Sequence, residues 1–387
     1  MFSSRGQFPL TPNALSEALA ARRVAGSELL DLTLSNPTQA GFEYPASLLA
    51  ALADPRGLRY EPEPFGLLSA RETVAASFRA RGAAVDAADV LHTASTSEAY
   101  ALLFKLLCDP GDEVLVPRPG YPLFDLLAPL ESVRLVSYPI RYDGSWHLDW
   151  AALMEAVTPR TRAVVVVSPH NPTGAFLKKS ELEALNALCR ERGLALVVDE
   201  VFSEYLLSTS RDPHVETVAG NEGALTFALG GLSKSCGLPQ AKLAWTVVSG
   251  PADLRREALA RMEIIADAFL SASTIVQMAL ADLLVAGAAI RTAIHARVRE
   301  NLNVLRAQIT SSSPWSLCSV EGGWTAVLRV PTTRSEEAWA LALLDDGVLV
   351  HPGYFFDFEE GAHLVVSLLP EPRIFAEGMR KIAAVIV

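Results

Sequence analysis

The chain of 387 residues lacks several features that define particular classes of protein. No G-x-G-x-x-G follows a strand-like run, which excludes a dehydrogenase built on that phosphate-binding loop. No uninterrupted apolar stretch reaches membrane-spanning length, and the N-terminal residues have no apolar core, so we expect neither a membrane protein nor a signal peptide. Lys and Arg number 33 against 44 Asp and Glu, which argues against a nucleic-acid surface.

Cysteine is scarce, and its positions are far apart. Cys108, Cys189, Cys236 and Cys318 form no C-x-x-C pair, so the sequence contains no zinc or redox motif of that kind. In so long a chain, isolated cysteines are typical of reduced thiols in a reducing compartment. We therefore expect a cytoplasmic protein without a metal site.

The middle of the chain alternates strand-like and helix-like segments. Runs with few polar residues cover 114–116, 163–167, 194–198 and 243–248, and helices are expected at 99–107 and 181–190. Strands that are apolar on both faces are usually covered by helices on both faces. The alternation therefore predicts an α/β fold with a mostly parallel sheet.

The last third of the chain has a different pattern. Residues 290–308 are typical of a long amphipathic helix. Short strands are expected at 325–330, 348–351 and 364–368, and helices at 335–344 and 374–386. This pattern predicts a second, smaller α+β unit.

Three polar residues follow three of the apolar runs. Asn171 opens Asn-Pro-Thr-Gly, Asp199 ends one run, and Lys234 lies in Gly-Gly-Leu-Ser-Lys-Ser. Ligands of parallel sheets bind at the carboxyl ends of the strands. An amide, a carboxylate and an amine at that edge are the groups that hold pyridoxal phosphate (PLP) and form a Schiff base with it.

Each of these residues also has an ordinary explanation, as a strand-end cap, a turn or an exposed lysine. In a PLP site, Asp199 would keep the pyridine nitrogen protonated and Asn171 would donate to the phenolic oxygen. Lys234 would need partial desolvation, so that its neutral amine is available. Their joint occurrence in this order favours the PLP site.

A phosphate site is predicted at the start of the helix expected at 99–107. The sequence there is Ser95, Thr96, Ser97 and Glu98. Ser95 and Glu98 fit a capping box, and a helix start rich in hydroxyl and N–H groups binds anions, although an ordinary N-cap would use the same residues.

Three further residues would complete the cofactor site. Ser233 would add a hydroxyl and Lys242 a positive charge for the phosphate. Tyr121 would stack on the face of the ring, or else pack within its Pro-Gly-Tyr-Pro loop.

Together these motifs resemble the class I/II aminotransferases among the fold-type I PLP enzymes, the aspartate aminotransferase superfamily. The matching segments run over nearly the whole chain: 60–66, 93–99, 109–112, 119–122, 171–174, 199–202, 233–239 and 322–323. The spacings from Asn171 to Asp199 and from Asp199 to Lys234 are ordinary for that family.

The resemblance implies a three-layer αβα PLP-transferase domain over residues 41–280. It implies a smaller α+β domain made of residues 1–40 and 281–387, and a homodimer with active sites at its interface. Lys234 would form the Schiff base and move the substrate proton, and Tyr60 would reach the phosphate bound to the neighbouring subunit.

The resemblance also outlines a substrate pocket. Asn36 and Asn171 would edge it, and Trp324 and Tyr354 would suit its wall, although both aromatic residues would equally suit the core of the small domain.

The chain departs from the family pattern at three positions. Lys242 replaces the usual phosphate-binding arginine; it keeps the charge and loses the bidentate fork. Phe202 replaces a tyrosine that donates to the phenolic oxygen, unless Tyr205 lies on the same face. Val365 stands where an arginine would bind the substrate carboxylate.

The missing arginine leaves three readings of the pocket open. Another cation supplies the charge, the substrate carries no carboxylate at that point, or the alignment is shifted. By region alone, Arg118, Lys105 and His351 are the candidate cations.

Three functions remain for comparison. The intact Lys, Asp and Asn favour an aminotransferase that works by a ping-pong mechanism between an amino acid and a 2-oxo acid. Phe202 and Val365 raise the alternative of a PLP-dependent carbon–sulfur lyase. A non-catalytic binding protein ranks last, because the catalytic set is complete.

Overall fold

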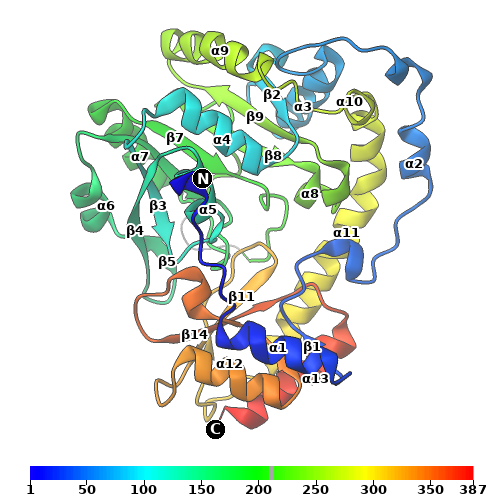
Figure 1. Ribbon diagram of the computed structural model, residues 1–387, viewed down its shortest axis with the longest axis vertical. Coiled ribbons are helices and arrows are strands. Elements are labelled where there is room, and N and C mark those ends of the chain that lie inside the picture. The colour runs from blue at the N-terminus through cyan, green and yellow to red at the C-terminus, as the bar shows by residue number, and fades with distance from the viewer. Residues whose placement is uncertain (209–212, 387) are drawn as a thin grey trace.

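The computed structural model describes residues 1–208 and 213–386, and an eight-stranded sheet lies at their centre (Figure 1). Its strands are β2 (Val90–Thr93), β3 (Glu113–Arg118), β4 (Arg134–Tyr142), β5 (Trp146–Leu148), β6 (Thr161–Val167), β7 (Ala195–Asp199), β8 (Thr226–Gly231) and β9 (Ala244–Ser249). The strand order is β2-β9-β8-β7-β6-β3-β4-β5. Neighbours from β8 to β4 pair in parallel, whereas β9 is antiparallel to β8 and β2, and β5 is antiparallel to β4. The predicted mostly parallel α/β sheet is confirmed.

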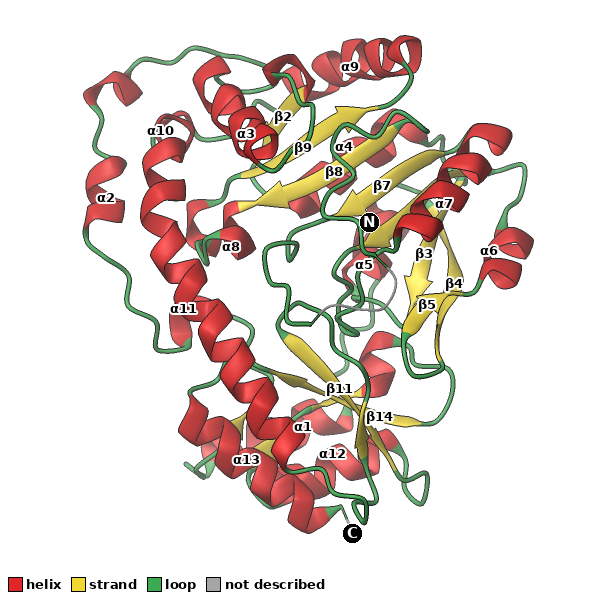
Figure 2. Ribbon diagram, turned by 180° about the vertical axis from the view of Figure 1, so that it is seen from behind, coloured by secondary structure: helices red, strands yellow, loops and turns green. Residues whose placement is uncertain are grey.

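Alternate residues of the central strands belong to two apolar cores, one on each face of the sheet. In β6, Ala163 and Val165 pack in the core that includes α4 (Thr96–Leu107), α5 (Leu123–Leu130) and α9 (Ala252–Asp267). Val164 and Val166 pack in the core that includes α3 (Leu68–Ala80) and α7 (Lys179–Arg192). Figure 1 shows α4 and α5 in front of the sheet, and Figure 2, from behind, shows α3 and α7 in front of it. Burial on both faces explains the continuous apolar runs.

The C-terminal part of the chain forms a four-stranded antiparallel sheet. Its order is β10 (Ser316–Leu317), β11 (Thr325–Val330), β14 (Ala362–Ser367) and β13 (His351–Pro352). Helices α12 (Glu336–Asp345) and α13 (Pro372–Val385) lie around it, together with α1 (Ala14–Val24) from the N-terminal segment (Figure 1). Strand β1 (Leu30–Asp31) pairs in parallel with β12 (Val348–Leu349), which joins the N-terminal segment to this part of the molecule.

Two predicted elements differ from the structure. The strand expected at 348–351 is divided, because Leu349 pairs with the N-terminal β1 whereas His351 pairs with β14. The helix expected at 290–308 is α11 (Leu280–Ala307), which begins earlier. Its first ten residues are rich in Ala and Leu, which are strong helix formers, and this extends the helix beyond the clearly amphipathic region.

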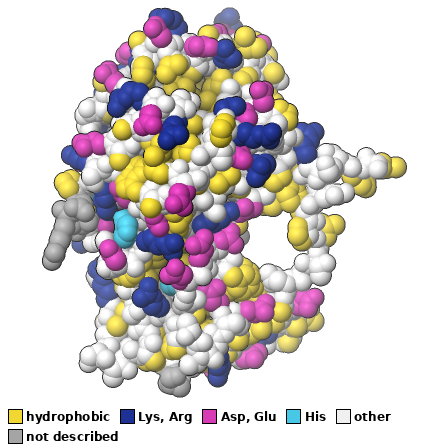
Figure 3. Space-filling model, turned by 90° about the vertical axis from the view of Figure 1, so that its left-hand side faces the viewer, with side chains coloured by type: hydrophobic (Ala, Val, Ile, Leu, Met, Phe, Trp, Pro, Cys, Tyr) yellow, Lys and Arg dark blue, Asp and Glu magenta, His cyan; other side chains and the backbone are white. Residues whose placement is uncertain are grey.

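The remaining elements are short. They are the helices α2 (Ser47–Ala51), α6 (Trp150–Ala156), α8 (Leu232–Ser235) and α10 (Thr274–Met278), and the 3₁₀ turns Ser4–Gly6, Pro37–Gln39, Pro55–Leu58, Ala87–Asp89, Pro239–Ala241 and Gly353–Phe356. Figure 3 shows one face of the molecule, on which basic and acidic side chains are interspersed. Within the described ranges, none of the helices is sufficiently long and apolar to cross a bilayer.

Candidate active site

Three neighbouring parallel strands bring the predicted polar residues to one edge of the sheet. The register aligns Val167 of β6 with Asp199 of β7, and Asp199 with Leu229 of β8. Asn171 follows β6, and Lys234 follows β8 in the short helix α8. The expectation that these three signals share the carboxyl edge is confirmed.

Lys234 lies beside two aromatic rings. Its Nζ is 5.6 Å from the ring centroid of Phe202 and 5.0 Å from that of Trp324. Burial lowers the pKa of Lys234, and the nearby charge of Asp199 opposes this shift. A larger fraction of the amine is therefore neutral than in a lysine exposed to water, and a nucleophilic lysine requires the neutral form.

Asp199 is buried beneath the edge of the sheet and has two hydrogen-bond donors. Its Oδ1 accepts from the Val201 N–H at 3.1 Å, and its Oδ2 accepts from the Tyr100 hydroxyl at 3.2 Å. Burial raises the pKa of Asp199 to about 6, against the opposing effects of these bonds and of Lys234. A nearby cationic ring nitrogen would reverse this shift and hold the carboxylate ionised.

Tyr100 is a site residue that the sequence reasoning missed. It lies one helical turn into α4, is fully buried, and reaches Asp199 from the helix that begins at the predicted phosphate site. The signal in the sequence is its position, shortly after the helix start that is predicted to bind phosphate.

The residues predicted to bind phosphate share the same edge. Ala244 pairs with both Thr93 and Gly231, so the turns that carry Ser95 and Ser233 lie at the same level on either side of β9. Lys242 lies two residues before β9, is exposed, and has a φ of 52°, a conformation uncommon for residues other than glycine. The backbone thus places two hydroxyl-bearing turns and one cation around the start of α4.

The predicted helix cap at Ser95 is confirmed. Ser95 Oγ accepts from the Glu98 N–H at 3.2 Å. The Glu98 carboxylate accepts from Ala94 N at 2.7 Å, and not from Ser95 N as in the standard capping box, and also from Ser271 Oγ at 2.7 Å. The turn is held firmly, with Thr96 and Ser97 at the positive end of the helix.

Asn171 lies in a loop that is tied to the smaller sheet. The carbonyl of the next residue, Pro172, accepts from Thr325 Oγ1 at 2.8 Å. The amide oxygen of Asn171 is buried and has no hydrogen-bond partner among the described residues. This fits a role in binding a ligand, since buried polar atoms are otherwise nearly always paired.

Tyr205 does not take the place of the missing tyrosine at Phe202. Its hydroxyl donates to the backbone oxygen of Lys234 at 2.6 Å, so it braces the turn beneath the lysine. Phe202 packs edge-on against Trp324, with ring centroids 5.2 Å apart. A phenolic oxygen of PLP would therefore have Asn171 as its donor on this side.

Replacing Phe202 with tyrosine tests which way this side chain faces. Phe202→Tyr places a hydroxyl near Lys234 Nζ, and a donor to the phenolic oxygen stabilises its deprotonated form. We expect the pH midpoint of the cofactor's visible absorbance to fall by about one unit. A spectroscopic pH titration of the PLP-loaded variant measures it, with Phe78→Tyr as the control at a buried aromatic residue of α3. An unchanged midpoint would mean that position 202 does not face the ring oxygen.

The other predicted residues lie farther from Lys234 or have local partners. Tyr60 is 68% exposed and Tyr121 is 45% exposed. Asn36 accepts through its amide oxygen from the backbone and hydroxyl of Thr38, at 3.1 and 2.8 Å. The Tyr354 hydroxyl donates to Glu337 of α12 at 3.4 Å. Tyr60 has the exposure expected of a residue that contacts a second subunit.

Val365, at the usual arginine position, is fully buried in β14 between Val327 and His351 of the neighbouring strands. His351 is therefore the candidate cation nearest to that position along the sheet. Its neutral form is favoured, because burial lowers its pKa, although the charge of Asp31 opposes this.

The other two candidate cations have carboxylate partners. Arg118 is buried and pairs with Asp125 at 2.5 Å and with Asp357 at 3.0 Å. Lys105 pairs with Glu131 at 2.6 Å and lies near the far end of α4, about 14 Å along the helix from Thr96. Lys105 therefore lies away from the edge of the sheet that carries the site.

Glu200 follows Asp199 and points to the opposite face of the sheet. Its buried carboxyl group predicts that the stability of the fold depends on pH. Its oxygens accept from Thr217 Oγ1 and Val218 N, both at 2.6 Å, and burial raises its pKa from 4.5 to about 7. The folded state holds the proton more tightly than the unfolded chain, so stability falls as pH rises from about 4.5 to 7, by about 3 kcal/mol.

We expect Glu200→Gln to remove this part of the pH dependence in the PLP-free protein. Urea unfolding at pH 5 and pH 7.5 measures it; the neighbouring charge of Asp199, which adds to the raised pKa of Glu200, remains in both proteins. Equal slopes for the wild type and the variant would contradict a raised pKa at Glu200.

Comparison with known proteins identifies the family. Residues 27–370 match the model of the aminotransferase class I and II family. The chain is 27% identical over 369 residues to the glutamate-pyruvate aminotransferase AlaA of Haemophilus influenzae, covering 92% of this chain and 90% of that protein. It is 30% identical over 370 residues to the arginine–pyruvate transaminase AruH of Pseudomonas aeruginosa, covering 94% and 91%.

Solved structures agree with this result. An aspartate aminotransferase mutant of Thermus thermophilus superposes with a TM-score of 0.84 at 26% identity, over 100% of this chain and 99% of that one. An alanine aminotransferase of Pyrococcus furiosus gives 0.88 at 23% identity over 99% of both chains, which bears on the fold alone. The chain belongs to the aminotransferase class I and II family, and it is a PLP-dependent aminotransferase.

The residues at the sheet edge fit the cofactor of this family. The buried carboxylate of Asp199, the side-chain amide of Asn171 and the desolvated amine of Lys234 follow adjacent strands, and the amide can donate to a phenolic oxygen through its nitrogen. The start of α4 offers N–H and hydroxyl groups to a phosphate. The relatives and the family model give the alternative of a carbon–sulfur lyase no support.

Proposed function

We propose that Lys234 is the catalytic lysine of this aminotransferase: its amine binds PLP covalently and then carries the proton between the substrate Cα and the cofactor carbon. The observation that carries this proposal is the register of β6, β7 and β8, which puts an amide, a carboxylate and an amine after adjacent strand ends. PLP supplies the electron sink when it is bound. Lys234 needs a neutral amine for both roles, and its buried, aromatic surroundings favour one.

We assign the other cofactor contacts from the same edge. Asp199, oriented by Tyr100, would pair with the ring nitrogen, Asn171 would donate to the phenolic oxygen, and Tyr121 would cover the ring. Phe202 would line the ring site without a polar contact. The phosphate would be held by Ser95, Thr96, Ser97, Ser233 and Lys242, with Tyr60 contributed by the second subunit of a homodimer.

For the substrates, we propose an amino acid as donor and pyruvate as the 2-oxo acid acceptor in a ping-pong mechanism. Pyruvate appears in the names of the glutamate-pyruvate and arginine–pyruvate relatives. Asn36, Asn171, Trp324 and Tyr354 would line the pocket. Because Val365 is apolar and buried, the substrate carboxylate would rely on neutral donors such as the amide of Asn171.

We also retain the division into a large domain of residues 41–280 and a small domain of residues 1–40 and 281–387, and a cytoplasmic location. The pairing of β1 with β12 supports grouping the N-terminal segment with the C-terminal part. The four cysteines are free thiols, which supports a reducing compartment.

An absorbance scan tests the function directly. PLP-loaded protein receives single additions of amino acids without a 2-oxo acid, with alanine, glutamate and arginine first. For an aminotransferase, the visible band is replaced by that of the amine form of the cofactor, and pyruvate restores it. A band that returns while 2-oxo acid and ammonia accumulate would identify a lyase instead.

A further inference from the structure

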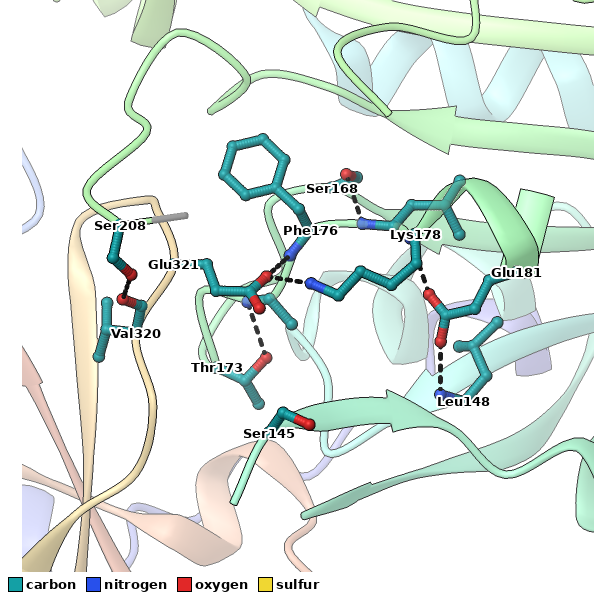
Figure 4. A network of polar contacts seen from close by, with 12 residues as sticks. Ser145, Leu148, Ser168, Thr173, Phe176, Lys178, Glu181, Ser208, Val320 and Glu321 are labelled. Atoms are coloured by element: carbon teal, nitrogen blue, oxygen red, sulfur yellow. Dashed lines mark hydrogen bonds and ion pairs between the residues drawn. The ribbon is translucent and has the colours of Figure 1, made fainter. Parts of the chain in front are cut away.

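A buried ion pair joins the two sheets close to the proposed active site (Figure 4). The Nζ of Lys178, at the start of α7, pairs with Oε2 of Glu321, shortly before β11. Each residue is only 5% exposed. The two residues lie 143 positions apart in the chain, so their contact is a product of the folded structure alone.

The secondary structure around Lys178 and Glu321 does not account for either charge. Lys178 caps the N-terminus of α7, where the helix dipole disfavours a cation. Glu321 would be a costly buried anion without Lys178 and the Phe176 N–H, which donates to the same oxygen at 2.8 Å. The lysine is therefore placed to neutralise Glu321, and Glu321 is placed to bind the segment that contains Phe176 and Lys178.

The segments joined by this pair carry residues of the proposed site. Figure 4 shows Glu321 pointing at Phe176 and Lys178, which end the loop that begins after β6 and contains Asn171. On the other side, Glu321 is followed by two glycines and then by Trp324, whose ring lies 5.0 Å from Lys234 Nζ. The backbone oxygen of Glu321 also accepts from Leu207 N at 2.7 Å.

Packing at this junction leaves no room for adjustment. The Gly322 N–H donates to the Gly174 oxygen at 2.9 Å. A Cβ atom added to Gly322 would lie 2.6 Å from the ring of Phe176 and 2.7 Å from the oxygen of Tyr205. A shift of Glu321 would therefore move the loop with Asn171 together with Trp324, which directly precedes β11.

We propose that Glu321 and Lys178 are positioning residues of this aminotransferase: their ion pair sets the places of Asn171 and Trp324 relative to Lys234. The inference rests on the proposed roles of Lys234 and Asn171. The contact between the two sheets would then affect the reaction rate as well as the stability, because displacements of about 1 Å at reacting groups reduce the rate by large factors.

The test begins with Glu321→Gln, which keeps the shape and the acceptor for the Phe176 N–H but leaves Lys178 as an unpaired buried cation. We expect kcat to fall by about 10- to 100-fold with a small change in KM. We also expect the pH midpoint of the cofactor's visible absorbance to shift, because Asn171 would move relative to the ring oxygen. The double variant K178M/E321Q removes both charges and should recover part of the loss in both quantities.

Glu113→Gln is the matched control. Glu113 is also 5% exposed, pairs with Arg134 and Thr158, and lies at the opposite, amino end of β3. We expect it to lower the melting temperature while kcat and the pH midpoint stay at wild-type values.

A Glu321→Gln enzyme with reduced melting temperature but wild-type kcat and pH midpoint would overturn the positioning role. If this variant does not fold, the double variant decides: wild-type values for both quantities would overturn the proposal, and a shifted midpoint with reduced kcat would support it. Failure of the proposed role of Lys234 is distinct, since the wild-type protein would then show no visible band with PLP.

Discussion

Lys234→Ala loses the visible absorbance that wild-type protein shows with PLP, and its turnover falls by roughly 10⁴-fold or more. The amine that binds the cofactor and the base that moves the substrate proton are the same group in this site, so one substitution removes both. The alanine fits without strain because Lys234 lies on a helical turn braced by the Tyr205 hydroxyl at 2.6 Å. Absorbance spectra and single-turnover kinetics with added PLP measure the two effects separately.

Lys105→Ala serves as the matched control for this variant. Lys105 has a carboxylate partner and a neighbouring aromatic ring, Phe269 at 5.5 Å, but it lies far along α4 from the strand ends. It should retain the spectrum and turnover of the wild type. If Lys234→Ala kept wild-type turnover, the assignment of the catalytic lysine, and with it the proposed site, would be wrong.

Asp199→Asn keeps the shape of the buried side chain and the hydrogen bond from Val201 but removes the negative charge. Without that charge, the ring nitrogen is no longer held protonated and electron withdrawal from the substrate weakens. We expect proton removal to slow by roughly 10²- to 10³-fold, with PLP bound more weakly. The rate is measured in a half-reaction with excess amino acid, and the affinity by titration of PLP.

Asp89→Asn controls for the loss of a buried carboxylate. Asp89 is 8% exposed, its pKa is also raised mainly by burial, and its partner is Arg255 at 3.5 Å. We expect a change in stability and an unchanged half-reaction. A near-normal rate for Asp199→Asn would place the electron sink under the control of another group.

The fold could be predicted because its information is local. A strand such as β6 is apolar on both faces, since alternate residues enter two cores, and the sequence therefore shows an unbroken apolar run that ends at a polar turn. Parallel strands then bring those turns to one edge by geometry alone. The same reasoning located Asn171, Asp199 and Lys234 before any contact was known.

The residues that the sequence did not reveal depend on distant partners. Tyr100 has no motif of its own, and its meaning comes from a hydrogen bond to a residue 99 positions away. Lys178 and Glu321 are unremarkable in sequence and become informative only when both are buried together. The division at 348–351 likewise arises because two neighbouring residues pair with strands from opposite ends of the chain.

Strand β9 has a consequence for how the protein is made. In the described part of the chain it is the strand that pairs with the edge strand β2, and it brings the turn at Ser95 level with the turn at Ser233. The two halves of the proposed phosphate site therefore come together only when β2 pairs with a strand that lies far along the chain. Closing so long a loop is slow, whereas a ligand stabilises only a site that already exists. We therefore expect PLP to stabilise the protein only after β2 has paired with β9.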